Sequence, residues 1–545
     1  MKKRFLALFN ATIMGLGMVG FSACQPIPTG NNSTSMVGPQ KENATAIYMS
    51  CYAGGFGSAW IRQAAVLFNE RFENYEVVVL PDHKDSTETT QSKIASDTTP
   101  GDVFLGDQNI RSMINQDMLM DLTSLYTTQD ENGQYLEDRI IDPTDWQHVT
   151  KRNGKYYAVP HNDSLISAVA DYGLFEEKGW LMYDDNGNIS AGRDGVSGTY
   201  DDGLPVTVDD WNELIENIIA DPTTCYPYIY SGKYYFYANF FLHNIWAQYT
   251  GVENYKLNYT FNGDFYSVDA NATTGITTEN GYVLYEIDKG REKAIEWAAA
   301  NLTNKLYTHP KSFLSTSHTD VQNYFVLGHK NAASNPRSAI LFDGIWWQNE
   351  ARPIFNSCEE ANDKDYAYGV HDYRIMLAPI VEGSYGLDGQ GNGAVLSCNE
   401  NCVIYAKKQS DPKKEEVAKA WVQFLTSDEV SKLFTLYSGG VRPYKYSLTD
   451  TEYASLDPFT KSVWDVYSDY DNVKIVRNYL LKWSNDINSI PSSLSVDPLT
   501  FKVNGITYTD VVPALRANLS AEKIMKGFTD LYSKTAWDKA VSELK

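Results

Sequence analysis

Short apolar runs alternate with segments of helical hydrophobic spacing from residue 46 onward. Strand-like runs cover 46–50, 77–80 and 102–107. Apolar residues at helical spacing fill 61–72, and a second helical segment covers 86–96. Strands that alternate with helices are typical of α/β proteins whose sheets are largely parallel. The pattern therefore predicts an α/β fold with mostly parallel sheets flanked by helices.

Polar and aromatic residues lie at the ends of the predicted strands. Tyr52 and Phe56 follow the first strand, and Asp107 and Asn109 lie at the end of the third. Ligands of α/β proteins bind beyond the carboxyl ends of parallel strands. These four residues are therefore the first candidates for a binding site.

The first 24 residues have the pattern of a secretory signal. Basic residues precede an apolar stretch at 5–21, which ends in Ser22, Ala23 and Cys24. This ending resembles the lipobox of bacterial lipoproteins, in which the cysteine is acylated with fatty chains such as palmitate. The polar residues 25–44 then predict a flexible tether. An ordinary signal peptide with a chance cysteine is the alternative.

The charge balance excludes one class of partner. The 545 residues include 46 basic and 69 acidic side chains, a formal net charge of −23. Phosphate binding needs a basic face, so nucleic acid is not the expected partner. Contact with the membrane is expected through the lipid anchor only, on the extracytoplasmic side of the cell membrane. The 38 tyrosines and 12 tryptophans fit either a stacking surface for a ligand or a large aromatic core.

Seven short segments along the chain form a recognisable series. They are DVFLGD at 102–107, YAVP through LFEEKGW at 157–180, PVTVDDW at 205–211, SAILFDGIW at 338–346, AP at 378–379, AKAWVQFLTS at 418–427 and GVRP at 440–443. Each motif is short, but in this order they resemble family 1 extracellular solute-binding proteins, the receptors of carbohydrate ABC importers.

The resemblance implies two α/β lobes of the type II periplasmic binding fold, joined by crossing strands. The ligand would bind between the lobes, which close by hinge motion. Insertions relative to the family all fall in the second lobe, at 181–203, 252–290 and 381–394. The implied boundaries are 45–162 with 396–445 for lobe one, and 163–395 with 446–545 for lobe two.

Aromatic residues of the second lobe are the strongest candidates for sugar contact. Trp346 occupies the place of the sugar-stacking tryptophan of the family, and Trp347 is its neighbour. Tyr235 and Tyr237 match an aromatic pair at the start of a family helix. Asp343 is expected to accept a hydrogen bond from a sugar hydroxyl. The alternatives are a core tryptophan at 346 or 347 and a helix-capping role for Asp343.

Further candidates lie at the expected crossings between the lobes and late in the chain. His161, Asn162 and Asp163 lie at the first crossing, with hinge capping as the alternative role. Arg442 faces either the cleft or the hinge. Trp483 is a late tryptophan of the kind that family members use for stacking.

A loop at 184–203 is rich in Asp, Asn and Gly. Oxygen ligands at alternate positions are typical of calcium loops, but position twelve is Gly195 rather than Glu, which excludes an EF-hand. A structural Ca²⁺ is one interpretation, and a solvated turn-rich loop is the other. The calcium candidates are Asp184, Asn186, Asn188, Asp194 and Asp201.

The function predicted from the resemblance is capture of a carbohydrate, expected to be an oligosaccharide, for delivery to ABC transporter permease subunits. HExxH, GxxxxGK[ST] and GxSxG motifs do not occur, so no enzyme activity is expected. Apart from calcium, no cofactor is predicted, and the chain is expected to be a monomer. Two alternatives remain open: a surface-anchored glycan-cleaving enzyme with a distant carboxylate pair, and a receptor for a non-sugar solute such as a peptide.

Overall fold

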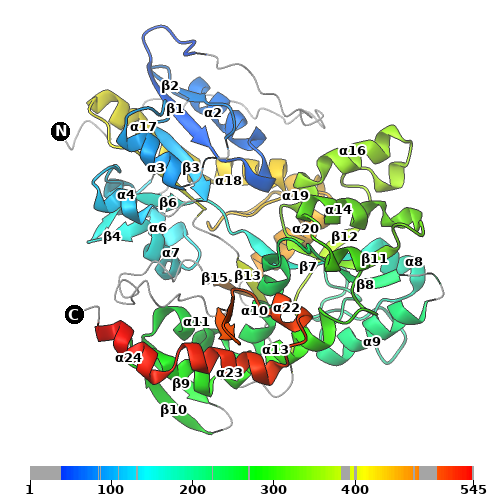
Figure 1. Cartoon of the computed structure of the whole chain (residues 1–545). Coiled ribbons are helices and arrows are strands. Elements are labelled where there is room, and N and C mark those ends of the chain that lie inside the picture. The colour runs from blue at the N-terminus through cyan, green and yellow to red at the C-terminus, as the bar shows by residue number, and fades with distance from the viewer. Residues whose placement is uncertain are drawn as a thin grey trace.

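The computed structural model describes most of residues 38–542. It does not describe 84, 86, 108–109, 131–132, 222, 224, 268–269, 382–392, 398–401, 470–472 and 478–499 within that range. Figure 1 shows two bodies, each built on its own sheet, with crossing segments between them. They are named lobe one and lobe two.

The sheet of lobe one has the strand order β2-β1-β3-β14-β6. β1 pairs in parallel with β2 and β3, so the three strands expected from the sequence share one direction. β14 is antiparallel to both of its neighbours. The bounds are β1 (Thr45–Cys51), β2 (Tyr75–Val79), β3 (Val103–Asp107), β6 (Ala158–Pro160) and β14 (Cys402–Ala406).

Helix α2 (Ala59–Arg71) shows why the apolar spacing in lobe one predicts a helix. Its buried residues include Ile61, Ala65 and Phe68, which lie three or four positions apart and so form one face. α17 (Pro412–Leu425) and α18 (Asp428–Ser438) complete the packing against this helix. The other helices of lobe one are α3 (Thr87–Ala95), α4 (Arg111–Asn115), α5 (Thr123–Thr127), α6 (Leu136–Arg139) and α7 (Pro143–Thr150), beside the short ribbon β4 (Lys151–Arg152) and β5 (Lys155–Tyr156).

The sheet of lobe two has the order β15-β13-β7-β11-β8, with β12 also paired to β7. β11 is parallel to β8, and β13 is parallel to β15, whereas β7 is antiparallel to β11, β12 and β13. The bounds are β7 (Leu165–Asp171), β8 (Cys225–Ile229), β11 (Arg337–Gly344), β12 (Tyr373–Met376), β13 (Gly393–Ser397) and β15 (Val473–Arg477).

The two-lobed α/β fold is as predicted, but the sheets are mixed rather than mostly parallel. The antiparallel strands are those next to the crossings. β7 is the first strand after the chain enters lobe two, and β14 is the strand by which it returns to lobe one. Parallel neighbours need a crossover connection that brings the chain back to the edge of the sheet where the previous strand began. A strand that enters directly from the other lobe starts at the opposite edge, so it runs antiparallel to its neighbours.

Helix α10 (Phe236–Thr250) is buried on nearly all sides in lobe two, where it packs against α13 (Lys289–Asn301) and the sheet. The last segment of the chain packs on the same layer through α22 (Val511–Arg516) and α23 (Ala521–Leu531) (Figure 1). The other elements are α8 (Tyr172–Lys178), α9 (Val208–Ala220), α11 (Val252–Thr260), α12 (Leu284–Ile287), α14 (His318–Leu327), α15 (Trp347–Glu350), α16 (Arg352–Glu360), α19 (Asp450–Ala454), α20 (Pro458–Ser468), α24 (Lys534–Ser542), and the ribbons β9 (Gly263–Ser267) with β10 (Ala272–Ile276) and β16 (Phe501–Val503) with β17 (Ile506–Tyr508).

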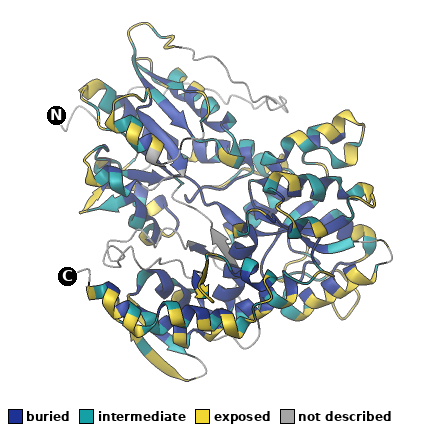
Figure 2. Cartoon of the chain, in the orientation of Figure 1, coloured by how far each residue is buried: buried dark blue, intermediate teal, exposed yellow. Residues whose placement is uncertain are grey.

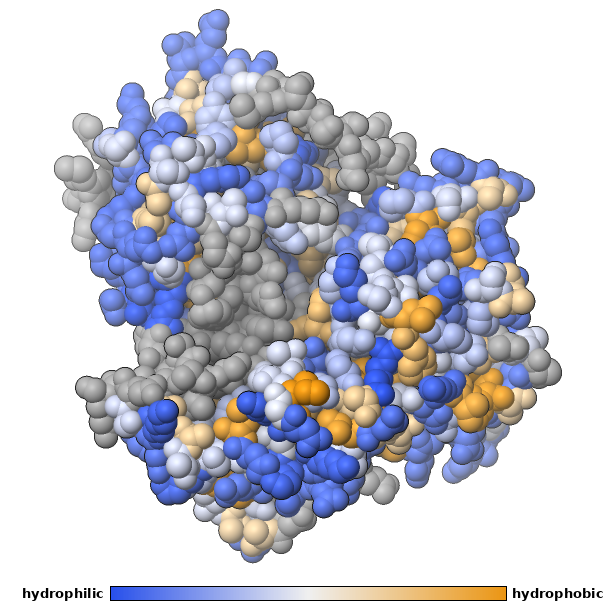
Figure 3. All heavy atoms as spheres, viewed as in Figure 1, coloured by the Kyte–Doolittle hydropathy of each residue, from blue (hydrophilic) through white to orange (hydrophobic). Residues whose placement is uncertain are grey.

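Burial follows this layering. Figure 2 shows buried residues along the strands and exposed residues on the outer faces of the helices. The face seen in Figure 3 is mainly hydrophilic, with apolar residues scattered in small groups. In the part of the chain that the structure describes, no helix combines the length and apolarity needed to span a bilayer.

Candidate functional site

Trp346 lies where the two lobes meet, two residues after the end of β11, and its side chain is half-buried. Phe56, from the short helix η1 (Gly54–Phe56) of lobe one, contacts it edge-on, with the ring centroids 5.9 Å apart. Tyr237, in the first turn of α10, lies 6.3 Å from it, centroid to centroid. The structure thus brings together three of the predicted ligand residues, from both lobes.

Two glycines make room for the indole ring. A Cβ atom on Gly344 would lie 2.3 Å from Cη2 of Trp346, and a Cβ atom on Gly55 would lie 2.4 Å from its Cδ1. Both distances are shorter than any normal contact between carbon atoms. The ring is therefore seated against the backbone at both ends, one end in each lobe.

Four polar side chains of lobe two interact with one another close to Trp346. The Nε2 atom of Gln322 donates to Oδ2 of Asp343 at 3.1 Å and to Oε2 of Glu350 at 2.8 Å. Nε2 of His318 lies 3.3 Å from the other carboxylate oxygen of Glu350. The His318 ring also lies near Tyr237, with the centroids 5.9 Å apart. This set of Asp343, Gln322, Glu350 and His318 is called the acid–amide cluster below.

Electrostatics in the acid–amide cluster disfavour two full negative charges. Burial, followed by the charge of Glu350, raises the pKa of Asp343 to about 7. The hydrogen bond to Glu350 raises the pKa of His318, against the effect of burial. Among the described residues, His318 is the only basic side chain paired with either carboxylate. Near neutral pH, the cluster therefore combines a hydrogen-bonded carboxylate, a readily protonated acid and an imidazole beside an aromatic ring.

Of the four residues in the acid–amide cluster, only Asp343 is among the candidates predicted from the sequence. His318 and Gln322 are four residues apart on α14, so they share one face of that helix. That spacing was a usable signal for their pairing with each other. Contact with Asp343 and Glu350 depends on how α14 packs on β11, which no local pattern predicts.

The residues predicted at the crossings are buried among contacts of the hinge, and their role as ligand contacts stays a prediction. Arg442 is fully buried and donates from Nε to the carbonyl of His161 at 2.8 Å. The His161 ring stacks on Trp60 at 5.1 Å, and burial, followed by Arg442, lowers its pKa well below the usual value. Asp163 is also fully buried and accepts a hydrogen bond from the Tyr467 hydroxyl at 2.9 Å.

Asn162 has a similar place in the hinge. It is buried, and its Nδ2 donates to Oγ of Ser164 at 2.8 Å. Asp163 also pairs through its backbone with Val441, on the segment that follows α18. The bonds from Arg442 to His161 and between Asp163 and Val441 join two crossing segments, which agrees with the hinge-capping alternative, whereas the bond from Asn162 to Ser164 lies within one segment.

Trp347 lies in the core of lobe two, which agrees with the core alternative given for it. It is fully buried among Phe325, Phe355, Tyr373 and Phe459, with centroid separations of 5.1 to 5.8 Å. Successive residues at the start of a helix point in different directions, so Trp347 enters the core while Trp346 faces the junction.

The remaining candidates are more dispersed. Tyr52 is half-buried in lobe one, where its backbone bridges to His83. Tyr235 is half-buried beneath the Arg516 guanidinium, which lies 5.2 Å from the ring centroid. Only the backbone of Asp107 is described, at the end of β3 opposite Cys402. Asn109, Trp483 and Cys24 lie outside the described residues.

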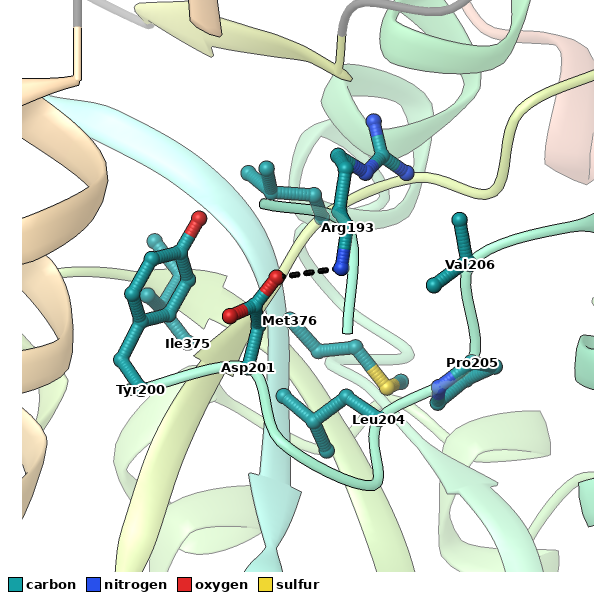
Figure 4. Close-up of a pocket in the computed structure, with 9 residues that line it drawn as sticks. Arg193, Tyr200, Asp201, Leu204, Pro205, Val206, Ile375 and Met376 are labelled. Carbon is teal, nitrogen blue, oxygen red and sulfur yellow. Dashed lines mark hydrogen bonds between the residues drawn. The ribbon is translucent and has the colours of Figure 1, made fainter. Parts of the chain in front are cut away.

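The loop at 184–203 closes on itself through its own carboxylates. Asp184 accepts hydrogen bonds from the backbone nitrogens of Asn186 and Asn188 at 2.9 and 2.8 Å. Asp201 accepts from the backbone nitrogens of Arg193 and Asp194, and Figure 4 shows its carboxylate pointing toward Arg193 N. Within the described ranges, no group of three or more His, Cys, Asp or Glu side chains is placed to hold a metal ion. The calcium site stays a prediction.

The pocket in Figure 4 lies between this loop and β12, and it shares no residue with the Trp346 site. Leu204, Pro205 and Met376 give it apolar walls. Burial lowers the pKa of Arg193 to about 10. The Nη2 atom of Arg193 donates to the carbonyl of Ala378 at 2.5 Å, so this side chain ties the loop to the segment after β12.

Comparisons with known proteins agree with this architecture. A family model described as a bacterial extracellular solute-binding protein matches residues 63–458. A solved chitin oligosaccharide binding protein is 14% identical, with 92% of this chain and 100% of that chain covered and a TM-score of 0.55.

Two further solved structures are similar. A probable secreted solute-binding lipoprotein from Streptomyces coelicolor is 12% identical, with coverage of 92% and 98% and a TM-score of 0.54. The GacH receptor of Streptomyces glaucescens GLA.O, solved unliganded and with acarbose, is 12% identical, with coverage of 91% and 100% and a TM-score of 0.51. At these identities the likeness shows the fold. No curated protein sequence matches the chain.

Proposed function

Because the chain belongs to the bacterial extracellular solute-binding proteins, we propose that its solute is a carbohydrate, expected to be an oligosaccharide, bound at Trp346 between the lobes. A sugar presents flat C–H faces and a rim of hydroxyl groups. It therefore needs an aromatic surface together with hydrogen-bonding partners.

The observation that carries this proposal is the position of the acid–amide cluster beside the aromatic group. Trp346 and Phe56 supply partly exposed aromatic surface, with Tyr237 buried beside Trp346, and Glu350 and His318 are the partly exposed members of the cluster. Asp343 and Gln322 are buried, and the Gln322 side-chain amide donates to the carboxylates of both Asp343 and Glu350. This amide therefore holds the Glu350 carboxylate in place. The solved relatives that name chitin oligosaccharide and acarbose support the same class of ligand.

A thermal-shift panel tests this proposal. A ligand that binds only the folded state raises the melting temperature, by an amount that grows with its concentration over Kd. The panel should contain chito-oligosaccharides, raffinose, maltotriose, xylo-oligosaccharides and a mixture of short peptides. Stabilisation by one sugar series supports the proposal. Stabilisation by peptides alone would assign the site to a different solute.

We also propose that the protein binds its sugar without cleaving it. The family consists of binding proteins. Retaining and inverting glycosidases need two carboxyl groups about 5–5.5 or 6.5–9.5 Å apart on either side of the scissile bond. Asp343 and Glu350 are instead hydrogen-bonded to the same nitrogen atom, with Asp343 buried. Chromatography of a sugar after prolonged incubation with the protein checks this point, since fragments would indicate turnover.

Delivery and anchoring complete the proposal. The protein would be held on the extracytoplasmic side of the membrane by lipid on Cys24 and would pass its sugar to ABC permease subunits. The motif at 22–24 and the polar stretch at 25–44 support the anchor. Membership of the solute-binding family supports the importer.

A further inference from the structure

We infer that Gly55 and Asn349 are positioning residues for ligand capture, which together seat the η1 turn of lobe one on Trp346 of lobe two. This inference rests on the proposed function only in that Trp346 is the ligand-contacting residue. Gly55 and Asn349 act through Trp346 and are not themselves taken as ligand contacts.

The seat is a direct contact between the lobes. Asn349 is on α15, which follows Trp346, and its Nδ2 donates to the backbone carbonyl of Gly55 at 2.7 Å. The same nitrogen would lie 3.5 Å from a Cβ atom on Gly57. The turn and the amide therefore meet closely, and a hydrogen bond joins one lobe to the other at this point.

Gly55 is required by the close approach of Trp346. A Cβ atom at position 55 would lie 2.4, 2.7 and 2.9 Å from Cδ1, Cγ and Cβ of the tryptophan. The Cβ atom of Trp346 is bonded to the backbone, so no rotation of the side chain relieves the contact at 2.9 Å. Any side chain at position 55 must therefore push the turn and α15 apart.

The turn is held firmly on its own lobe, so this separation becomes a movement between lobes. The Phe56 ring packs on Phe434 of α18, with the centroids 5.2 Å apart. A Cβ atom on Gly440 would lie 2.7 Å from Cε1 of Phe56. Because lobe one holds Phe56 in place, a methyl group at position 55 displaces lobe two from the η1 turn. The junction between the lobes then opens where the ligand is expected to be enclosed.

Three variants test this inference. Gly55→Ala adds the methyl group. Asn349→Asp keeps the acceptor that receives a hydrogen bond from Nη2 of Arg352 at 3.1 Å but removes the donor to Gly55. Gly275→Ala is the matched control, because its Cβ atom would lie at an ordinary 3.6 Å from Oδ1 of Asp264. All three are made in the full-length protein.

Two measurements are needed. Small-angle X-ray scattering of the sugar-free proteins gives the radius of gyration, which changes when lobes separate. Calorimetric titration uses chitotriose, raffinose and maltotriose as probes. We expect a larger radius for Gly55→Ala and Asn349→Asp than for the wild type and Gly275→Ala. The affinity for whichever probe binds the wild type should fall about tenfold, with the melting temperature of the sugar-free protein little changed.

Scattering curves of both variants that superimpose on the wild type would overturn the inference. A larger radius with unchanged affinity would also overturn it, because the seat would then play no part in capture. If Gly55→Ala does not fold, Asn349→Asp decides both points. If no probe binds the wild type, the proposed ligand class fails, while the scattering comparison still decides whether Gly55 and Asn349 hold the lobes together.

Discussion

Two neighbouring tryptophans have opposite surroundings although they are adjacent in the chain. Trp346 is half-buried between the lobes, whereas Trp347 is enclosed by aromatic residues of lobe two. A stacked ring is worth roughly 0.5–1.5 kcal/mol beyond its buried area. The two residues should therefore respond differently to removal of their side chains.

Trp346→Ala should weaken sugar binding at least tenfold, about 1.4 kcal/mol, while the melting temperature changes little. Trp347→Ala should instead lower the free energy of unfolding by about 3–5 kcal/mol. Calorimetric titration and thermal melting of both variants check this. Trp464→Ala is the control, since Trp464 is another half-buried tryptophan, packed on Tyr446 with the centroids 5.1 Å apart. Lost stability with unchanged affinity in Trp346→Ala would remove Trp346 from the site.

Asp343 should give the protein a pH-dependent stability. Its pKa is raised to about 7 in the folded chain, against about 3.9 in an unfolded chain. The folded state therefore binds more protons between these values, and this contribution to stability is full below pH 4 and is lost as the pH rises through 7. The melting temperature of the wild type should fall relative to Asp343→Asn between pH 5 and pH 8. Parallel curves for the two proteins would contradict the raised pKa.

Candidate site residues are predictable where chain position and the family resemblance point to the same place. Trp346 and Asp343 lie at the end of an apolar strand, in a segment that resembles the family. Gln322 and Glu350 are distant from each other in sequence, and they meet through the packing of two helices on one strand. Arg442 and Asp163 are polar residues for which the sequence allows either a cleft or a hinge position, and both are buried among hinge contacts.

At the scale of elements, local periodicity indicates the orientation of those that are half-exposed. Helix α2 buries one face and was found from its spacing. Helix α10 is buried at nearly every position, so its sequence lacks a polar face and cannot be oriented from its pattern. The insertion at 252–290 forms α11, the ribbon β9–β10 and α12, whose arrangement depends on packing against the rest of lobe two.

The loop at 184–203 gives a test at this scale. If the loop binds calcium, a chelator should lower the melting temperature of the purified protein, added calcium should restore it, and Asp184→Ala should abolish the response. The measurement is thermal melting with a chelator, with and without excess calcium. A loop held only by its hydrogen bonds, such as those from Asn186 and Asn188 to Asp184, predicts no response to the chelator.

For the whole molecule, the order of weak motifs was more informative than any one of them. Seven short segments in family order predicted two lobes, and the structure has two sheets with crossing segments between them. The direction of the strands was not predictable from the same pattern, because an apolar run has no preferred pairing partner. Pairing follows from the path of the chain between lobes, which is a property of the whole fold.

Anchoring is also a property of the whole molecule. Cys24→Ser should release the processed protein from membranes, because a lipid chain contributes about 0.8 kcal/mol per buried CH₂ and two or more chains are needed for stable attachment. Fractionation of cells that express each protein, followed by mass determination of the mature chain, checks this. A variant that is fully processed and still sediments with membranes would refute the lipid anchor.

The central claim is that one oligosaccharide binds between the lobes and remains intact. Calorimetric titration of the wild-type protein with the sugar series that raises its melting temperature tests this most directly. The sugar is then recovered from the calorimeter cell and its chain length is checked by chromatography. The account predicts saturable binding of one sugar per chain and recovery of the sugar uncleaved. Absence of binding across the whole panel, or recovery of shortened sugars, would contradict it.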